Sequence, residues 1–401
     1  MEIRKLYPHE YVQYEAICQM VFFEMERIDI HEKMKEPEKH GDDNPIWGAF
    51  DSKGRLCSAV MVIPEIMRIN GHNTNVGIAG GVVTLQEARG KGAIDRIMER
   101  AFAAMRDEED QIFSFVYPFS YSYYRRLGYE TCCPRHRAII PVDQFKQYPY
   151  PTRLERFEKG GDSTPFREVY KDFTRNRNFA IVRDDEAWEE ILDRDPYRDL
   201  QFTFLHRDEG GKPDAYVLYD TKQNEEEGNT AEIKEFCWKT VQGFHHVLGF
   251  FGKLGSEYEK VSWNSGDLDV HTLFSESWEL ETEFESAGMA RLTDICRPLT
   301  LLTQPAGSGS VSIGVTDKFL SGNSGVYEVQ WEPGIKLCRA RKTAALHTPD
   351  LECSQETLVQ LITGYSTPRE ALYRQGTIIR SNRDSLTALF PKRALFMTEH
   401  Y

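Results

Sequence analysis

Residues 80–98 read GGVVTLQEARGKGAIDRIM. The β-branched residues Val82, Val83 and Thr84 favour an extended backbone. After Gly92, apolar residues recur at the spacing of one helix face, at Ile94, Ile97, Met98, Ala101, Phe102 and Met105. The sequence therefore predicts a strand, a basic glycine-rich turn and an amphipathic helix.

The turn between this strand and helix has the composition of a phosphate- or pyrophosphate-binding loop. A helix start leaves backbone N–H groups without partners, and Arg89 and Lys91 add positive charge there. The Gly-Lys pair is not followed by Ser or Thr, which excludes a P-loop, and the glycine spacing is not that of a dinucleotide-binding fingerprint. On this stretch alone, a plain surface turn is the alternative interpretation.

Size and charge limit the possible functions. A chain of 401 residues with 40% hydrophobic and 12% aromatic residues predicts two or three folded domains. The net charge of −14 argues against binding to nucleic acid or to an anionic membrane. It is compatible with a cationic substrate, although ordinary solubility is the simpler explanation of the charge.

The chain gives no sign of a membrane span, a leader or a metal site. No stretch reaches the roughly 20 apolar residues that span a bilayer, and the N-terminal residues 1–6, MEIRKL, lack the apolar run of a signal peptide. We therefore expect a cytoplasmic protein. The eight cysteines form no Cys-x-x-Cys pair and no His-Glu-x-x-His occurs, so we expect neither a metal site nor a disulfide framework.

The order of predicted elements suggests three α+β domains. The first, residues 1–150, has a strand, a helix over residues 11–23, a charged loop at 31–44 and a meander of strands that leads into the glycine-rich turn. The second, 151–290, follows a Pro-rich seam and repeats a similar order without the basic turn. The third, 291–401, has alternating strands and a helix over residues 354–364 that Ser354 begins and Gly364 ends. Smaller predicted elements are strands at 56–63, 66–69, 179–182 and 335–340, and a helix that carries His245 and His246 as surface or packed side chains.

Two motifs in the first domain resemble the GNAT acetyltransferases. One is Thr84-x-x-x-x-Arg89-x-x-Gly92-Ala93, which is similar to the acetyl-CoA signature of that family. The other is the segment 123–129, YYRRLGY, which is similar to the signature that closes many GNAT domains. Gln86 and Ile94 depart from the usual pattern, where many members have Pro and Gly or Ala, but neither removes a backbone donor.

The resemblance implies a set of acetyl-CoA-binding residues and a catalytic tyrosine. In the family a splayed strand holds the pantetheine arm and the turn holds the pyrophosphate. The positions that match in this sequence are Val82, Val83, Thr84, Arg89, Gly90, Lys91, Gly92, Ala93, Ile94 and Asp95, with Phe119 and Ser120 after the following strand. Tyr124 matches the general acid that protonates the departing thiolate, a role that suits a phenol with a pKa of about 10. Tyr121 and Tyr123 are expected to line a pocket or the core.

The whole chain resembles the enhanced intracellular survival (Eis) family, in which a GNAT domain, a degenerate GNAT domain and a sterol-carrier-protein-like domain follow one another. This resemblance implies acetyl transfer from acetyl-CoA to amines, aminoglycosides or polyamines among them, without a metal, and a homo-oligomer, a hexamer. It also implies that the terminal carboxylate of Tyr401 is the general base, whereas residues 388–401 read alone allow a solvated tail. The alternatives are a non-catalytic acyl-CoA or lipid carrier and a protein-lysine acetyltransferase.

Overall fold

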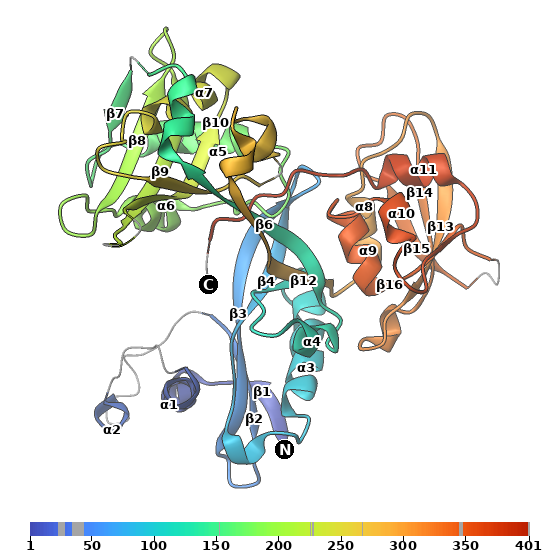
Figure 1. The fold of residues 1–401 in the computed structure, drawn as a ribbon. Helices are drawn as coiled ribbons and strands as arrows, with labels where there is room; N and C mark the ends of the chain where they lie inside the picture. Colours follow the sequence, from blue (N-terminus) through green and yellow to red (C-terminus); the bar gives the residue numbers. More distant parts are fainter. Residues whose placement is uncertain are drawn as a thin grey trace. The chain divides into compact units, whose positions relative to one another are not determined.

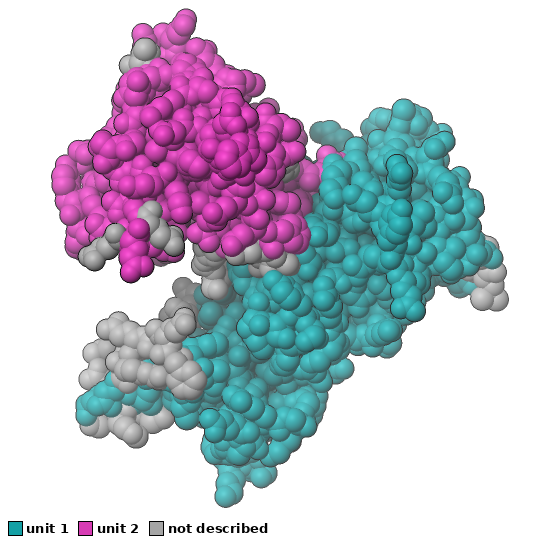
Figure 2. Space-filling view, in the orientation of Figure 1, with its two compact units in different colours: residues 1–132, 288–392, 401 teal, residues 133–287, 393–400 magenta. Residues whose placement is uncertain are grey.

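The structure is a computed structural model in which we describe residues 1–22, 29–33, 44–151, 153–224, 226, 228–266, 268–344 and 348–399, without the side chains of residues 31, 33 and 285–287. The chain forms two compact units (Figures 1 and 2). The first contains the described residues of 1–132 and 288–392, and the second those of 133–287 and 393–400.

The first unit begins with a sheet whose strand β4 leads into the glycine-rich turn. Its strand order is β1-β2-β3-β4-β5-β12. The bounds are β1 Glu2–Lys5, β2 Ile46–Phe50, β3 Leu56–Ile69, β4 His72–Thr84, β5 Phe113–Val116 and β12 Glu281–Leu292, which enters the unit at Gly288. β4 and β5 are parallel and are joined by the crossover helix α3, Ala93–Asp107. α3 runs along the sheet (Figure 1) and buries its predicted apolar face, with Ile97, Ala101 and Phe102 fully covered.

β3 is one strand where the sequence predicted two. The predicted break lay at Pro64, between strands at 56–63 and 66–69, but Pro64 pairs with Gly77 inside a continuous ladder. β2 pairs with β3 only from Leu56 to Met61. Among the described residues, Pro64 therefore has a strand neighbour on one side only, and an edge of this kind tolerates a residue without an N–H group.

Short helices complete this part of the unit. The predicted helix over residues 11–23 is α1, Tyr11–Val21, and α4 is Tyr121–Arg125. The predicted loop at 31–44 is helical at its start, where α2 spans Ile30–Lys33, and residues 34–43 lie outside the described part of the chain. Gly128, which follows α4, has φ +85°, the left-handed conformation predicted for it.

The rest of the first unit is a five-stranded sheet with the order β15-β14-β13-β16-β17. Its strands are β13 Gly309–Thr316, β14 Gly325–Trp331, β15 Arg339–Thr343, β16 Leu351–Ser354 and β17 Ile378–Ile379, and its helices are α8 Cys296–Thr300, α9 Gln355–Ile362, α10 Pro368–Ala371 and α11 Arg383–Leu389. The Ser354 hydroxyl accepts a hydrogen bond from the Thr357 N–H and caps α9 as predicted. The predicted strand at 335–340 is wrong in its bounds, because the turn after β14 extends to Cys338 and delays β15.

The second unit is a sheet in the order β6-β11-β10-β9-β8-β7, covered by three helices. The strands are β6 Glu130–Pro141, which enters the unit at Cys133, β7 Leu154–Arg156, β8 Gln201–Arg207, β9 Pro213–Lys222, β10 Thr230–Trp238 and β11 Lys260–Asn264, and the helices are α5 Thr164–Thr174, α6 Asp185–Leu192 and α7 Val241–Phe251. α7 buries Phe244, Val247 and Phe251 against the sheet. The predicted strand at 179–182 is wrong, because Phe179 has φ +72° and breaks an extended run.

Candidate active site

A pocket of about 790 Å³ lies in the first unit, where β4 ends and α3 begins. Its lining includes all the predicted acetyl-CoA-binding residues except Val83 and Ser120, namely Val82, Thr84, residues 89–95 and Phe119. Val82 and Thr84 lie on one face of β4 and Val83 on the other, because side chains alternate along a strand. Val83 is buried in the core beneath α1. Ser120 precedes α4, and its hydroxyl lies 3.3 Å from that of Ser122.

The glycine-rich turn lines this pocket with backbone and positive charge. Gly90 and Gly92 have φ +73° and +68°, and no atom lies within 4 Å of the position that a side chain would take. Arg89 and Lys91 are exposed, and the Lys91 ammonium donates a hydrogen bond of 2.8 Å to the Glu87 carbonyl. The first turn of α3 begins directly after Gly92. The turn can therefore offer N–H groups, a helix N-terminus and cations to an anion.

β4 approaches the pocket with an open edge. Across the described residues, β5 pairs with β4 only from Val76 to Ile78, although β4 continues to Thr84. On the other side, Gly81 and Val82 together oppose Val60, which makes a β-bulge. Gly81 has φ +51°, and its carbonyl accepts a hydrogen bond of 3.2 Å from the Tyr14 hydroxyl. An extended ligand can bind the exposed backbone groups of β4 beyond the bulge.

Tyr124 lies directly behind the lining of the pocket. It is 3% exposed, and its ring contacts Phe119 and Tyr123, both of which line the pocket, at 5.4 and 5.3 Å between ring centroids. Burial raises the pKa of Tyr124 well above its ordinary value. Among the described residues, its hydroxyl makes no hydrogen bond. The phenol is therefore neutral at physiological pH and keeps its proton for a ligand.

The lining also contains side chains that motif reasoning missed. Arg126 lies 4.5 Å above the Tyr123 ring and forms an ion pair with Asp95. The sequence held a signal for this contact, because Tyr123 and Arg126 are three residues apart and residues at that spacing are neighbours on a helix. Val21 and Phe22, at the end of α1, also line the pocket, and nothing in their local sequence indicates it.

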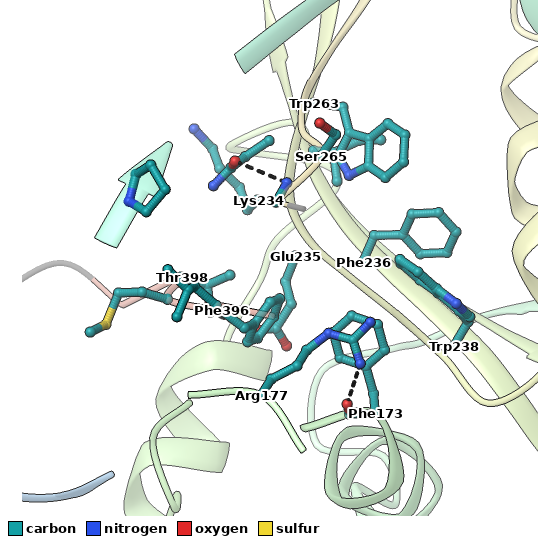
Figure 3. Close-up of a pocket in the computed structure, with 16 residues that line it drawn as sticks. Phe173, Arg177, Lys234, Glu235, Phe236, Trp238, Trp263, Ser265, Phe396 and Thr398 are labelled. Atoms are coloured by element: carbon teal, nitrogen blue, oxygen red, sulfur yellow. Dashed lines mark hydrogen bonds between the residues drawn. The ribbon is translucent and has the colours of Figure 1, made fainter. Parts of the chain in front are cut away.

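Tyr401 lies outside the described residues, but the segment that leads to it is docked in the second unit. Asn178 brackets this segment, with its N–H donating to the Ala394 carbonyl and its carbonyl accepting from the Phe396 N–H, both at 2.9 Å. Figure 3 shows Phe396 and Thr398 beside Phe173 and Glu235 at a small pocket of about 40 Å³. Residues 395–398 of the C-terminal segment form part of the lining of this pocket.

A buried ion pair fixes the end of this segment. The Arg183 guanidinium donates to Glu235 at 2.9 Å and to Glu399 at 2.8 Å, and the Thr398 hydroxyl donates to Glu235 at 2.7 Å. Both charged side chains of the Arg183–Glu235 pair are 1% exposed. Burial opposes ionisation of Glu235, but Arg183 holds the pKa of its carboxyl below the ordinary value.

The described residues show no second candidate active site at the histidine pair, and neither a metal-binding cluster nor a membrane-spanning helix. His246 lies 2.8 Å from His206, nitrogen to nitrogen, so it is a packed side chain as expected. Over the described part of the chain, no cluster of three or more His, Cys, Asp or Glu side chains is arranged to hold a metal ion. Nor does any helix there combine the length and apolar character that crossing a bilayer requires.

Comparison with known proteins agrees with this geometry. An acetyltransferase (GNAT) domain model matches residues 2–132, a second acetyltransferase (GNAT) domain model matches residues 180–292, and a sterol carrier protein domain model matches residues 297–398. The chain consists of two GNAT domains and a sterol carrier protein domain. These matches identify a GNAT-type acyltransferase, and they agree with the tandem α+β architecture predicted from the sequence.

Solved structures share this three-domain fold over the whole chain. A GCN5-related N-acetyltransferase from Anabaena variabilis has a TM-score of 0.82 at 18% identity and covers 100% of both chains. A protein of unknown function from Enterococcus faecalis, a probable N-acyltransferase, has 0.80 at 19%, covering 98% of this chain and 97% of its own. Eis1 from Mycobacterium abscessus has 0.78 at 15%, covering 100% of both chains. No curated protein matches the sequence. The GNAT chain described here therefore has the fold of Eis1, as the sequence motifs predicted.

Proposed function

We propose that the protein transfers an acetyl group from acetyl-CoA directly to an amine of a cationic small molecule, such as an aminoglycoside or a polyamine. The observation that carries this proposal is the pocket at the end of β4, where the open strand edge, the basic turn and Tyr124 meet. The best test is to measure release of coenzyme A when acetyl-CoA is mixed with a panel of polyamines, aminoglycosides and lysine peptides. Release with none of them would favour the carrier alternative, and release with peptides alone would favour a lysine acetyltransferase.

Binding of acetyl-CoA follows from the groups that line the pocket. The pyrophosphate is held by the N–H groups of the 89–93 turn and by the charges of Arg89 and Lys91. The pantetheine arm bonds to the open edge of β4, and a backbone N–H near Val82 stabilises the negative charge that develops on the thioester oxygen. The residues thus hold the thioester carbonyl for attack.

Proton transfers complete the reaction. In the proposed mechanism the substrate ammonium loses a proton to the Tyr401 carboxylate, directly or through water, and the free amine attacks the thioester carbon. The C–N bond forms, the attacking nitrogen gives up its second proton to water, the C–S bond breaks, and the leaving sulfur takes a proton from the Tyr124 hydroxyl, which solvent later reprotonates. The neutral state of Tyr124 suits this role as an acid.

Replacing Arg89 by Ala is expected to weaken acetyl-CoA binding by about 10- to 100-fold, because a charge-assisted bond to the pyrophosphate contributes about 1.5–3 kcal/mol. Titration calorimetry measures this change, and raising the salt concentration should narrow the difference from the wild type. The control is Lys53→Ala, which removes an exposed cation from the Asp51–Gly54 turn, outside the pocket lining. Equal effects of the two substitutions would exclude the proposed pyrophosphate site.

Extending the chain beyond Tyr401 with a short tag is expected to lower kcat by about tenfold, because the tag converts the terminal carboxylate into an amide. The expected loss is moderate, since a carboxyl with an ordinary pKa of about 3.5 is a weak base at neutral pH. The same tag on the N-terminus is the control. Full activity of the C-terminally tagged protein would exclude Tyr401 as the base.

We also propose that the protein is cytoplasmic and, from its likeness to the Eis family, that it is a homo-oligomer, a hexamer. Light scattering of the purified protein tests this assembly, and a monomer would exclude it.

A further inference from the structure

We propose that the end of β12 and the sterol carrier protein domain together hold the turn that carries Tyr124, with Arg291 from β12 and Asp317 and Gln355 from the sterol carrier protein domain as positioning residues. This inference rests on the proposed role of Tyr124 as the general acid. It gives the third domain a function in acetyl transfer that needs no lipid ligand.

The turn after Tyr124 satisfies its own N–H groups. The Leu127 and Tyr129 N–H groups donate to the Tyr124 carbonyl at 3.0 and 3.2 Å, and the Gly128 N–H donates to the Arg125 carbonyl at 2.9 Å. The carbonyls of Leu127 and Gly128 point the other way. A buried carbonyl without a partner costs about 1–3 kcal/mol, so these two need donors from elsewhere in the chain.

Both donors come from distant parts of the sequence. Arg291, at the end of β12, donates to the Leu127 carbonyl, and Gln355, the first residue of α9, donates to the Gly128 carbonyl. Each donor is 0% exposed. The two carbonyls that end the Tyr124 turn are therefore held by side chains that the acetyltransferase domain of residues 2–132 does not contain.

The donors are themselves fixed by further hydrogen bonds. The side-chain Oε1 of Gln355 accepts a hydrogen bond of 2.9 Å from the Leu292 N–H, so the amide side chain of Gln355 bridges β12 and the turn. Arg291 donates to Asp317 at 2.8 Å, and both side chains are 0% exposed. Asp317 also accepts from the Phe319 and Leu320 N–H groups at 3.0 and 2.8 Å. The three side chains of this network, Arg291, Asp317 and Gln355, are all buried.

Close packing transmits the position of Arg291 to the Tyr124 ring. A side chain at Gly128 would place its Cβ 2.7 Å from Arg291 Nη1, so only glycine allows the approach. Arg291 lies 4.5 Å above the Phe102 ring, which contacts Tyr129, and Tyr129 contacts Tyr124, each at 5.8 Å between centroids. A shift of the turn would therefore move the phenol, and a displacement of about 1 Å can lower a rate by about 100-fold.

The test is Gln355→Met, which preserves the length of the side chain and removes both of its hydrogen bonds. We expect kcat to fall about 10- to 100-fold, with the Kd of acetyl-CoA unchanged, because the turn at residues 89–93 does not contact Gln355. In the Tyr124→Phe background the same substitution should lower kcat no further, because the displaced hydroxyl is already absent.

The matched control is Gln360→Met on the same helix. Gln360 is also buried and donates to a carbonyl across the same pair of domains, that of Thr131 at 2.7 Å, but Thr131 lies in β6 beyond the turn. This variant should lose thermal stability and keep its kcat. If Gln355→Met does not fold by circular dichroism, Gln355→Asn, one methylene too short to reach Gly128, replaces it in the same comparison.

Three results would overturn the proposal: an unchanged kcat in Gln355→Met, an equal loss in the Tyr124→Phe background, or an equal loss in Gln360→Met. If Tyr124→Phe alone leaves kcat unchanged, the assignment of Tyr124 as the general acid is wrong. This result comes from a variant with Gln355 intact, so it is distinguishable from a failure of the positioning proposal.

Discussion

Replacing Tyr124 by Phe is expected to lower kcat by about 10²- to 10⁴-fold, the usual contribution of a general acid, while the Kd of acetyl-CoA stays the same. The phenol lies behind Phe119 and Tyr123 and has no hydrogen-bond partner among the described residues, so its loss leaves no buried group unsatisfied. Steady-state kinetics with saturating acetyl-CoA and titration calorimetry measure the two quantities. A large loss of kcat without a loss of affinity would identify a role in the transition state.

The pH profile gives a second check on Tyr124. Burial raises its pKa above the ordinary value of about 10, so the hydroxyl keeps its proton to a higher pH than a free phenol does. We therefore expect no fall of kcat from this group below about pH 10. The control is Tyr121→Phe on the same helix, where the side chain is 40% exposed and does not line the pocket. If kcat falls as the pH rises through neutrality, and this fall is absent in Tyr124→Phe, the assignment of Tyr124 as the general acid is contradicted.

Replacing Arg291 by Met is expected to lower the free energy of unfolding of the first unit by about 3–5 kcal/mol, the cost of breaking a buried ion pair. The substitution leaves Asp317 without its cation and the Leu127 carbonyl without its donor. Burial lowers the pKa of Arg291, and the neighbouring charge of Asp317 opposes that shift. Urea denaturation, followed by a probe in the first unit, measures the loss.

The double variant Arg291→Met/Asp317→Asn separates the lost charge pair from the lost packing. Neutralising Asp317 should recover part of the stability, because the remaining amide keeps polar partners in the Phe319 and Leu320 N–H groups or Asn323. If the loss of unfolding free energy in the double variant equals the sum of the losses in the two single variants, the Arg291 and Asp317 side chains are not coupled.

Local sequence patterns predicted the parts of the fold that local physics determines. The strand, turn and helix at residues 80–98 follow from β-branched residues, glycines and a helical apolar period, and the structure has β4, a turn with positive φ at Gly90 and Gly92, and α3 there. The capping of α9 by Ser354 follows from the chemistry of one hydroxyl. Two of the elements predicted wrongly depend on tertiary context: among the described residues Pro64 has a strand neighbour on one side only, and residues 179–182 form no strand because Phe179 turns left-handed beside the C-terminal segment.

The sequence predicted which types of residue form the candidate site, but only partly which of their side chains face the pocket and which are buried. The alternation along β4 could have separated Val83 from its neighbours, since only one face of a strand can meet the pocket. The burial of Tyr124 and the bonds from Arg291 and Gln355 could not be read from the sequence, because they join positions 164 and 227 residues apart. No local pattern encodes such a pairing. The role of Tyr401 and the boundaries at 150/151 and 290/291 stay predictions.

The pairing of β5 has a consequence for biosynthesis. β5 pairs with β12 through Phe113–Val116 and Met289–Leu292, and residues 133–287 of the second unit are translated between these two strands. A nascent chain that has emerged only to residue 132 therefore presents the apolar edge of β5 to solvent, and a truncated protein ending there should aggregate through that edge. The second unit in turn receives Phe396 and Glu399 only after residues 288–392 of the first unit have been translated, so its packing cannot be complete before that point.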